Sequence, residues 1–441
     1  MATFKPVELI EVYIWNKRVG AVAMDPNRGY YAFEYDAKFR KTGIELAPFQ
    51  MPLSLATGPF IFTALPLETF KRLPAMLADA LPDAFGNALV NAWMADKGVA
   101  ADKITTLDRL AYMGKRGMGA LEFRPARGSH VASSAALQLG KLVNVARQAV
   151  SGTVADDPHA KAVLAQIIQV GTSAGGARAK AAVAWNEATD ELRPGQFDVE
   201  DGFQHWLLKF DGVGEDKALG VSKDYGRIEY AYSLMAKEAG VDMSRCHLLS
   251  ENGRSHFMTQ RFDRDGNKRI HMQSLCAISH MDYKQVGTHS YNQLFDAIQR
   301  LGLGQDTLRQ AFRRMVFNVM AANRDDHPKN FAFLLSEGGT WKLAPAFDVT
   351  FSYRPDSAWV NQHLMSVNGK FSDITSQDIE AVAEQMGIRL EARTAIREVG
   401  KAVARWPEFA ATAGVQEAEV EQIDAQIKLF CKPITDRENL A

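Results

Sequence analysis

The sequence predicts an α+β fold in which β-rich segments precede a helical C-terminal part. Short apolar runs separated by turn residues occupy residues 9–35, and strand-like segments recur between residues 171 and 272. From Ser274 onward, apolar residues recur mainly at helical spacing. A chain of 441 residues is too long for one ordinary compact core, so we expect two or three domains.

The N-terminal part is expected to form a small sheet followed by helices. Its strands are predicted at residues 9–15, 19–24 and 30–35. Helical periodicity covers residues 67–95, with a break at Leu81-Pro82 after which Asp83 can cap the next helix. The other expected elements here are a helix at 107–112, a strand at 120–123 and a polar linker at 124–134.

The rest of the chain is expected to contain a second β-rich part and then helices. Strands are predicted around residues 171–185, 203–210, 246–249, 256–262 and 269–272. Helices are predicted at residues 135–149, 157–166, 227–239, 292–302, 306–322, 374–387, 391–404 and 416–430. We therefore predict an α/β subdomain at 1–128, a β-rich lobe at 129–272 and an all-helical lobe at 273–441.

Composition and charge narrow the functional classes. The chain has 51 Lys and Arg against 52 Asp and Glu, so its net charge of −1 provides no field that attracts nucleic acid. Its three cysteines lie far apart and form no CxxC motif, which argues against a disulfide framework or a structural zinc site and fits a reducing cytoplasm. No window reaches the roughly 18 apolar residues of a membrane helix, so we expect a soluble protein with no membrane partner.

The segment 323–330, Asn-Arg-Asp-Asp-His-Pro-Lys-Asn, carries the strongest chemical signal. Four residues separate Asp325 from Asn330, which is the spacing of a kinase catalytic loop. In such a loop the Asp accepts the proton of the attacking hydroxyl, and the Asn amide oxygen holds magnesium. Lys329 can offset charge on a transferred phosphoryl group. The structural alternative is a polar loop whose aspartates cap backbone N–H groups.

A second candidate metal ligand follows the loop. Asp348 ends the apolar approach at residues 343–347, eighteen residues after Asn330. This order matches the kinase position that supplies the main Mg²⁺ ligand, although a lone Asp after a strand is often only a turn residue. Taken with Asp325 and Asn330, Asp348 is predicted to bind magnesium.

A loop of small residues at 171–180 is a candidate phosphate cover. Small residues let backbone N–H groups approach phosphate oxygens closely. Gly171 and Gly176 have Walker spacing, but Ala177 stands where the Walker lysine is required. The following residues, from Lys180 on, can continue as a strand, so a strand-loop-strand phosphate cover and a simple hairpin tip both remain open.

Lys209 lies near the end of an apolar strand at residues 203–210, 33 residues beyond Gly176. A kinase presents its phosphate-binding lysine from a central strand in this way. The alternative is a lysine that extends from the strand end to solvent.

In this order, the glycine loop, Lys209, Asp325, Asn330 and Asp348 resemble the HipA family, the kinase toxins of bacterial HipBA toxin-antitoxin modules. The resemblance implies a bilobal protein-kinase-like fold with a β-rich nucleotide lobe and a helical catalytic lobe. In the N-terminal part it rests on the short motifs at residues 51–55, 80–83 and 114–121.

The resemblance also implies roles for individual residues. Asp325 would be the catalytic carboxylate, Asn330 and Asp348 the magnesium ligands, and Lys209 a ligand of the ATP phosphates. His327 and Lys329 would lie in the active centre, although His327 can also be a loop histidine bonded to a carbonyl. Residues implied in nucleotide binding are Gly175, Gly176, Ala177, Lys180, Gln260, Arg261, Phe262 and Asp263.

Ser173 matches the loop serine that HipA kinases autophosphorylate, an event that expels the loop and stops activity. A dianion inside a phosphate-binding loop would repel ATP and compete for the same N–H donors. The alternative is a small polar residue that suits a loop. Intact mass after incubation with Mg·ATP should show one added phosphate that Ser173→Ala removes.

The resemblance implies a serine/threonine protein kinase that acts as the toxin of a type II module, with ATP and Mg²⁺ as cofactors. Its expected partners are a HipB-like helix-turn-helix antitoxin and an acceptor protein such as an aminoacyl-tRNA synthetase, with DNA reached only through the antitoxin. Two alternatives remain: a small-molecule phosphotransferase, and a co-repressor binding protein whose kinase activity is secondary or lost.

Overall fold

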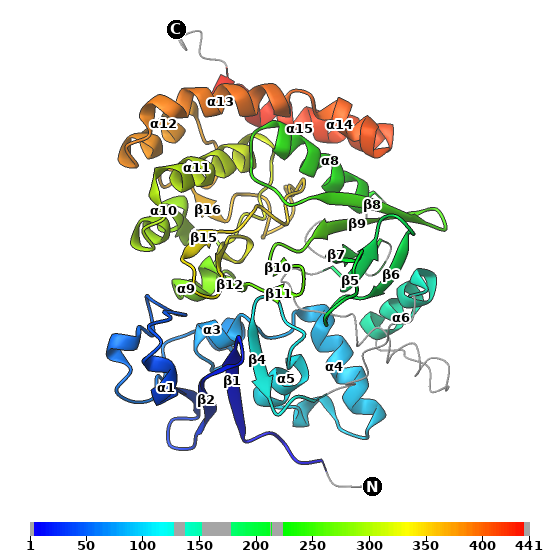
Figure 1. Cartoon of the computed structure of the whole chain (residues 1–441). Helices are drawn as coiled ribbons and strands as arrows, with labels where there is room; N and C mark the ends of the chain where they lie inside the picture. The colour runs from blue at the N-terminus through cyan, green and yellow to red at the C-terminus, as the bar shows by residue number, and fades with distance from the viewer. Residues whose placement is uncertain (1–3, 128–136, 152–177, 212, 214–223, 436–441) are drawn as a thin grey trace. The chain divides into compact units, whose positions relative to one another are not determined.

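The computed structural model describes residues 4–127, 137–151, 178–211, 213 and 224–435. The chain is mixed α/β and forms two compact units, each built from several stretches of sequence (Figure 1). Unit 1 comprises residues 1–214, 260–282 and 334–340, and unit 2 comprises residues 215–259, 283–333 and 341–441.

The N-terminal sheet of unit 1 is antiparallel with strand order β3-β2-β1-β4. Its strands are β1 (Leu9–Ile14), β2 (Lys17–Asp25), β3 (Tyr30–Tyr35) and β4 (Leu121–Arg124). Ile10, Val12 and Ile14 of β1 are buried, as the period of two requires for a sheet with one core face. Trp15 and Asn16 adopt positive φ between β1 and β2, the conformation of a tight hairpin turn. The three predicted N-terminal strands are thus confirmed.

The helices of unit 1 are shorter than the periodicity predicts. The stretch 67–95, predicted as helical with a break at Leu81-Pro82, contains three helices, because Pro66 and Pro74 start new helices and Lys71 leaves the helical conformation with φ of 51°. Asp83 caps the third, accepting a hydrogen bond of 2.8 Å from the Gly86 amide, as expected. The helices are α1 (Ala37–Arg40), α2 (Leu67–Phe70), α3 (Ala75–Ala78), α4 (Ala84–Asp96), α5 (Thr106–Met113), α6 (Leu139–Ser151) and α9 (Leu275–Ile278).

The central strands of unit 1 are antiparallel, and β5 lies between β6 and β7. These strands are β5 (Lys180–Asn186), β6 (Glu191–Pro194) and β7 (Gln204–Lys209). β10 (Arg264–Asp265) and β11 (Lys268–Arg269) form a separate antiparallel pair, and β12 (His271–Ser274) belongs to another sheet. The register of β5 and β7 places Lys180 directly opposite Lys209. Gly195 follows β6, and a Cβ there would meet backbone atoms of Val183 at 2.2 Å, so only glycine permits this close approach.

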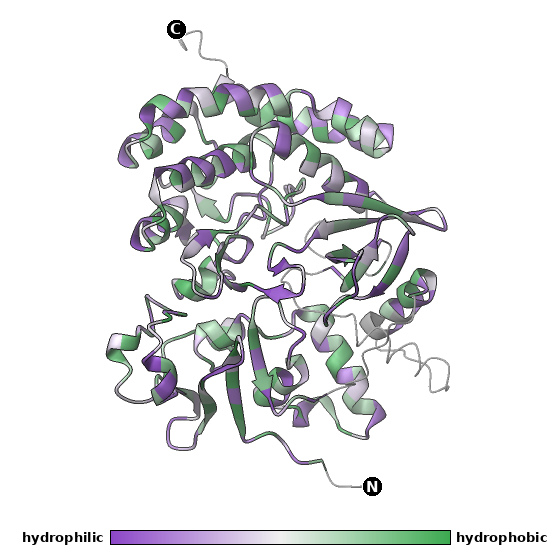
Figure 2. Cartoon of the chain, in the orientation of Figure 1, coloured by the Kyte–Doolittle hydropathy of each residue, from purple (hydrophilic) through white to green (hydrophobic). Residues whose placement is uncertain are grey.

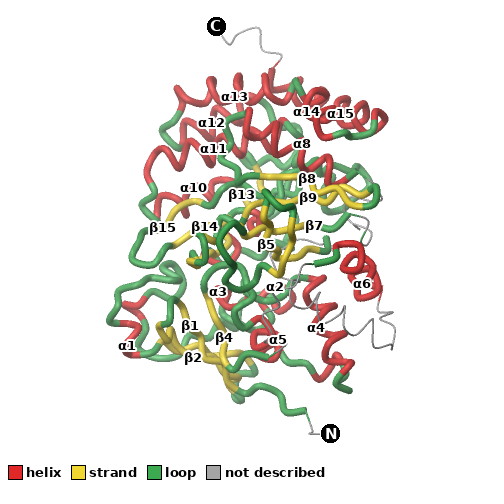
Figure 3. Tube along the Cα trace, turned by 45° about the vertical axis from the view of Figure 1, so that its right-hand side comes forward, coloured by secondary structure: helices red, strands yellow, loops and turns green. Residues whose placement is uncertain are grey.

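Unit 2 is dominated by helices that bury their apolar faces against one another (Figures 2 and 3). The helix α11 contacts α10, α13 and α15. Capping boxes begin α10, with Ser290 and Gln293, and α12, with Thr375 and Asp378. The helices are α8 (Tyr225–Glu238), α10 (Tyr291–Arg300), α11 (Gly304–Met320), α12 (Ser376–Gln385), α13 (Arg389–Val403), α14 (Trp406–Ala413) and α15 (Glu417–Thr435).

The part after residue 273 is not all helical, which corrects the prediction. Four strands of two to four residues interrupt the helices, and segments this short between loops cannot nucleate a helix. They are β13 (His289–Ser290), β14 (Ala332–Leu335), β15 (Trp341–Leu343) and β16 (Met365–Ser366).

Earlier in the chain, the strands β8 (Cys246–Glu251) and β9 (Arg254–Gln260) form an antiparallel hairpin. Within the described ranges, no helix is both long enough and apolar enough to span a membrane.

Candidate active site

The candidate catalytic loop begins where α11 ends. Ala322 turns the chain with φ of 52°, and the Asn323 amide donates to the Asn318 carbonyl at 2.9 Å. Residues Pro328–Asn330 form a single 3-10 turn that starts at proline, whose missing N–H costs nothing in the first position. The loop is therefore held at both ends by local backbone structure.

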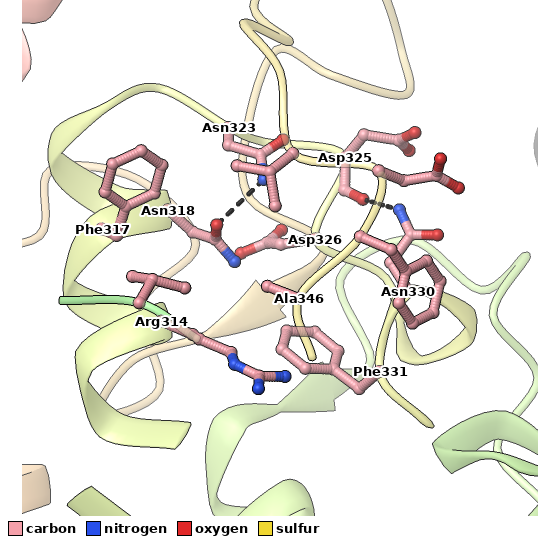
Figure 4. A pocket seen from close by; sticks show the side chains of 13 residues that line it. Arg314, Phe317, Asn318, Asn323, Asp325, Asp326, Asn330, Phe331 and Ala346 are labelled. Carbon is pink, nitrogen blue, oxygen red and sulfur yellow. Dashed lines mark hydrogen bonds between the residues drawn. The ribbon is translucent and has the colours of Figure 1, made fainter. Parts of the chain in front are cut away.

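Asp325, Asn330 and Asp348 line one pocket of unit 2. Figure 4 labels Asp325 and Asn330 at this pocket. The Asp325 side chain is 33% exposed, so it can meet solvent or a ligand. The Asn330 side-chain amide donates from Nδ2 to the Asp325 carbonyl at 2.8 Å, which directs the amide oxygen to the other side. Asp348 adopts a left-handed φ of 52°, an unusual conformation for a residue other than glycine. The structure thus brings together the three residues predicted as base and metal ligands.

The oxygens at this pocket fit a magnesium ion that arrives with phosphates. Among the described residues, no three His, Cys, Asp or Glu side chains are grouped as a metal site. Of the side chains that line the pocket, the predicted metal ligands are the Asp348 carboxylate and the Asn330 amide oxygen. Magnesium is commonly held by one or two carboxylates and completes its shell with phosphate oxygens and water. The donor set therefore matches a metal shared with a nucleotide better than a metal held by protein alone.

Aromatic side chains surround Asp325 on the loop. The indole of Trp359 donates from Nε1 to Asp325 Oδ1 at 2.7 Å, and His327 Nε2 lies 3.6 Å from the same oxygen. The His327 ring packs on Tyr283 and Trp359, with centroids 5.1 and 5.9 Å apart. Lys329 Nζ lies 5.5 Å from the Tyr283 ring centroid. His327 thus lies beside the loop carboxylate, and both His327 and Lys329 contact Tyr283.

Asp326 forms a buried network that the sequence analysis did not identify. Its Oδ2 accepts hydrogen bonds from Tyr291 Oη at 2.7 Å and from His363 Nδ1 at 2.9 Å, and its Oδ1 accepts from the Leu364 amide at 2.7 Å. Burial and Asp326 raise the pKa of Tyr291 well above its usual range, so the phenol stays protonated and donates. The two adjacent aspartates therefore differ in burial. Asp326 is buried and stabilises the fold, whereas Asp325 is accessible to solvent.

Arg314 of α11 lines the same pocket and was also missed. It is 4% exposed, and burial lowers its pKa to about 10, so it remains charged at neutral pH. This guanidinium is the cationic side chain that lines the pocket beside Asp325, Asp326 and Asp348. The sequence did show an arginine on the apolar face of an amphipathic helix, where arginine is rarely buried without a charged partner.

In unit 1 the two predicted phosphate lysines are neighbours. Lys180 and Lys209 face each other across β5 and β7, and both are buried. Lys180 Nζ lies 3.7 Å from Asp83 Oδ2 at the start of α4. This carboxylate offsets one of two like charges that would otherwise repel across the strands.

The predicted adenine and ribose segment is largely committed to a buried ion cluster. Arg261 donates to both oxygens of Asp263, at 2.9 and 2.7 Å, and both side chains are fully buried. Arg264 and the Gly119 amide donate to the same carboxylate at 2.8 and 2.7 Å. Burial alone would raise the pKa of Asp263, but the two arginines outweigh it and hold the pKa far below its usual range. The Asp263 carboxylate is therefore committed to the fold in this structure.

Gln260 and Phe262 flank this cluster, and Gln260 Nε2 donates to Gln204 Oε1 at 3.4 Å. Ser173, Gly175, Gly176 and Ala177 lie outside the described residues.

Two family models match the chain over most of its length. The HipA N-terminal domain matches residues 10–124, and the HipA-like C-terminal domain matches residues 172–406. The chain belongs to the HipA family. The candidate loop, Lys209 and Asp348 all fall within the HipA-like C-terminal domain, and the sheet β3-β2-β1-β4 falls largely within the HipA N-terminal domain.

Known relatives of this HipA-family chain extend the comparison. A chain from the solved complex of the Shewanella oneidensis MR-1 toxin-antitoxin system HipA, HipB and its operator DNA matches with a TM-score of 0.64 and 17% identity, covering 96% of this chain and 97% of that one. This likeness shows a shared fold. Proteins described as candidate kinases from Sinorhizobium fredii (Y4mE) and Haemophilus influenzae are 28% and 29% identical, over 26% and 27% of this chain. The aligned stretches span only 30% and 39% of those two relatives.

Proposed function

We propose that this HipA-family protein is an ATP-dependent serine/threonine protein kinase. The observation that carries the proposal is the meeting of Asp325, Asn330 and Asp348 at one pocket, in the order and with the spacing of a kinase catalytic loop and its metal ligand. The names of the candidate-kinase relatives support the same class. A bilobal arrangement, with the nucleotide between a β-rich and a helical lobe, is part of the proposal.

The proposed reaction transfers the γ-phosphoryl group of ATP to a protein hydroxyl. A bond forms between the acceptor oxygen and the γ-phosphorus while the bond from that phosphorus to the bridging oxygen of ADP breaks, and Asp325 takes the hydroxyl proton. Asn330 and Asp348 would hold Mg²⁺, which neutralises charge on the phosphates. Lys209 would bind the phosphates. His327 and Lys329 would border the reacting groups.

The remaining nucleotide contacts follow the family resemblance. Gly175, Gly176, Ala177 and Lys180 would cover the phosphates. The backbone around Gln260, Arg261, Phe262 and Asp263 would contact adenine and ribose. Ser173 would be the autophosphorylated residue.

We also propose that the protein acts in the cytoplasm as the toxin of a HipBA-type module. The structural neighbour was solved with HipB and operator DNA, which supports a HipB-like antitoxin as the partner of this chain. With a net charge of −1, this chain would reach DNA through that partner rather than by its own field. An aminoacyl-tRNA synthetase is a candidate acceptor, from the family precedent.

The test is transfer of labelled γ-phosphate into a lysate of the host by wild type, Asp325→Asn and Asp356→Asn. Asp356 is the matched control because it is an exposed aspartate on the segment that follows Asp348. Loss of a general base lowers rates by about 10²- to 10⁴-fold, so Asp325→Asn should lose the labelled bands with an unchanged melting temperature, and Asp356→Asn should keep them. Equal labelling by wild type and Asp325→Asn would reject the catalytic assignment.

Calorimetry with ATP, with and without Mg²⁺, tests nucleotide binding separately. A failure of wild type to bind Mg·ATP, together with a stable complex with a helix-turn-helix protein, would favour the co-repressor function. Transfer of label to small molecules alone would favour a small-molecule phosphotransferase.

A further inference from the structure

We propose that Trp359 is a positioning residue that holds the Asp325 carboxylate in the orientation required to receive the acceptor proton. The proposal rests on the proposed kinase function. Its starting observation is the short hydrogen bond from the Trp359 indole nitrogen to Asp325 Oδ1, at 2.7 Å. Trp359 lies outside the kinase-like motif and is brought to it only by the fold.

The segment that contains Trp359 is fastened to three consecutive residues of the catalytic loop. Arg324 donates from its guanidinium to the Asn361 carbonyl, and Asp325 accepts from Trp359. Asp326 accepts from His363 and from the Leu364 amide. Residues 359–364 therefore hold residues 324–326 in register, through donors and acceptors from both backbone and side chains.

A second stretch of the same segment adds backbone pairing. The Ser352 amide donates to the Ala322 carbonyl at 3.1 Å, and the Arg324 amide donates to the Ser352 carbonyl at 3.3 Å. The Arg324 guanidinium also lies over the rings of Tyr353 and Phe430, 4.3 and 4.2 Å from their centroids. The loop and this segment thus form one interlocked unit, which favours a static support over a lid that must leave.

The indole itself has little freedom to turn. Its ring packs edge-on against Tyr283, with centroids 6.5 Å apart and planes at 89°, and tilts against His327 at 5.9 Å. The Trp359 backbone amide lies 3.3 Å from Ser357 Oγ, and the next residue, Val360, is fully buried. A donor fixed on both sides restricts rotation of the carboxylate that it binds.

Restricting a catalytic carboxylate has a kinetic consequence. The rate of a positioned proton transfer is sensitive to small displacements, because a shift of about 1 Å can cost roughly 10²-fold. The neutral indole holds Asp325 through a hydrogen bond, and Trp359 is not one of the proposed metal ligands. Removal of the indole N–H should therefore lower kcat and leave nucleotide affinity unchanged.

The decisive variant replaces Trp359 by 3-benzothienylalanine, which keeps the shape of the indole but has sulfur in place of N–H. Trp359→Phe is a second variant that uses a natural amino acid. Trp93→Phe is the control, because Trp93 packs on Tyr112 and Lys97 of unit 1. We expect kcat to fall by about 10- to 100-fold in both Trp359 variants. The Kd for Mg·ATP from calorimetry should stay within about twofold, and Trp93→Phe should match wild type.

Two kinetic outcomes would overturn the proposal. An unchanged kcat with the benzothienyl side chain would mean that the N–H does not act on Asp325. A raised kcat would mean that the indole obstructs the carboxylate instead of positioning it.

An activity-independent readout separates this inference from the kinase proposal. The chain has seven tryptophans, and the indole ¹H–¹⁵N resonance missing from Trp359→Phe identifies Trp359. That resonance should shift in Asp325→Asn and stay in place in Asp356→Asn. No shift would overturn the contact itself. If the resonance shifts in Asp325→Asn but the wild-type protein transfers no phosphate, the proposed function is wrong and the contact still stands.

Discussion

Two aspartates at predicted functional positions, Asp263 in unit 1 and Asp325 in unit 2, have opposite environments. Asp263 is fully buried, and two arginines and a backbone amide saturate it. Asp325 is 33% exposed, and it accepts a hydrogen bond from the neutral indole N–H of Trp359. A carboxylate neutralised by arginines in the core is tied to folding, whereas a partly exposed carboxylate at a pocket can meet a ligand.

Other charged side chains of the two units differ in the same way. In unit 1, Lys180 is buried against Asp83, and Arg261, Arg264 and Asp263 form a closed cluster. In unit 2 the carboxylates of Asp325 and Asp348 open on a pocket. We infer that charge removal in unit 1 mainly changes stability, and that charge removal at the pocket mainly changes chemistry.

The largest effect on stability is expected for Asp263→Asn. The change leaves Arg261 and Arg264 in the core with a neutral partner, and breaking a buried ion pair costs about 3–5 kcal/mol. Differential scanning calorimetry should show the melting temperature of unit 1 falling by roughly 6–20 °C. Asp356→Asn, which alters an exposed pair with Arg354, should leave the transition in place. A normal melting temperature with lost Mg·ATP binding would show instead that Asp263 serves the nucleotide.

A smaller loss of stability is expected for Asp83→Asn. Asparagine still caps α4, so the change removes the charge that faces Lys180 while it keeps the helix start. We expect the free energy of unfolding in urea to fall by about 2–3 kcal/mol, and a second change, Lys180→Met, to recover most of this loss. Calorimetry on the double variant tests the comparison directly. Retained Mg·ATP binding would assign Lys180 to the fold, and its loss would assign Lys180 to the phosphates.

The residues of the pocket could be predicted from the sequence, but the residues that support them could not. The spacing of Asp325, Asn330 and Asp348 was sufficient to predict a shared pocket, because a helix end and a short strand fix where each side chain lies. The pairing of Lys180 with Asp83 joins residues far apart in sequence. The supports of the loop, Trp359 and His363, likewise come from a later segment without regular structure. Such partners follow from tertiary packing, which local periodicity does not encode.

Helix positions were predicted better than helix ends. The proline at 74 was visible in the sequence, yet the apolar period ran through it and predicted one helix between residue 67 and the break at Leu81-Pro82, where the structure has two. The buried Arg314 was equally visible in α11, but only the fold shows that its helix face meets the pocket and not a neighbouring helix. Periodicity predicts which face is buried, and the structure identifies what that face contacts.

The buried histidine His271 of unit 1 should make the stability of the protein depend on pH. Burial, with help from Arg269, lowers the pKa of His271 to about 3, below the ordinary value near 6.5. His271 is therefore neutral when folded and takes up a proton when unfolded, so its contribution to stability is complete above pH 6.5 and is lost as the pH falls toward 3. Between pH 7 and pH 5 the loss should be about 2 kcal/mol, because each pH unit below 6.5 costs roughly 1.4 kcal/mol.

Urea unfolding of wild type and His271→Leu at pH 7, 6 and 5 measures this linkage. Leucine alters packing at every pH alike, so the informative quantity is the slope of unfolding free energy against pH, which should be flatter in His271→Leu. Equal slopes would place the proton uptake elsewhere, with His280 of the same unit as the next candidate because burial lowers its pKa to about 4. A flatter slope in His271→Leu, with the proposed phosphate transfer by the folded protein unchanged, would separate the charges that stabilise this fold from those at the pocket.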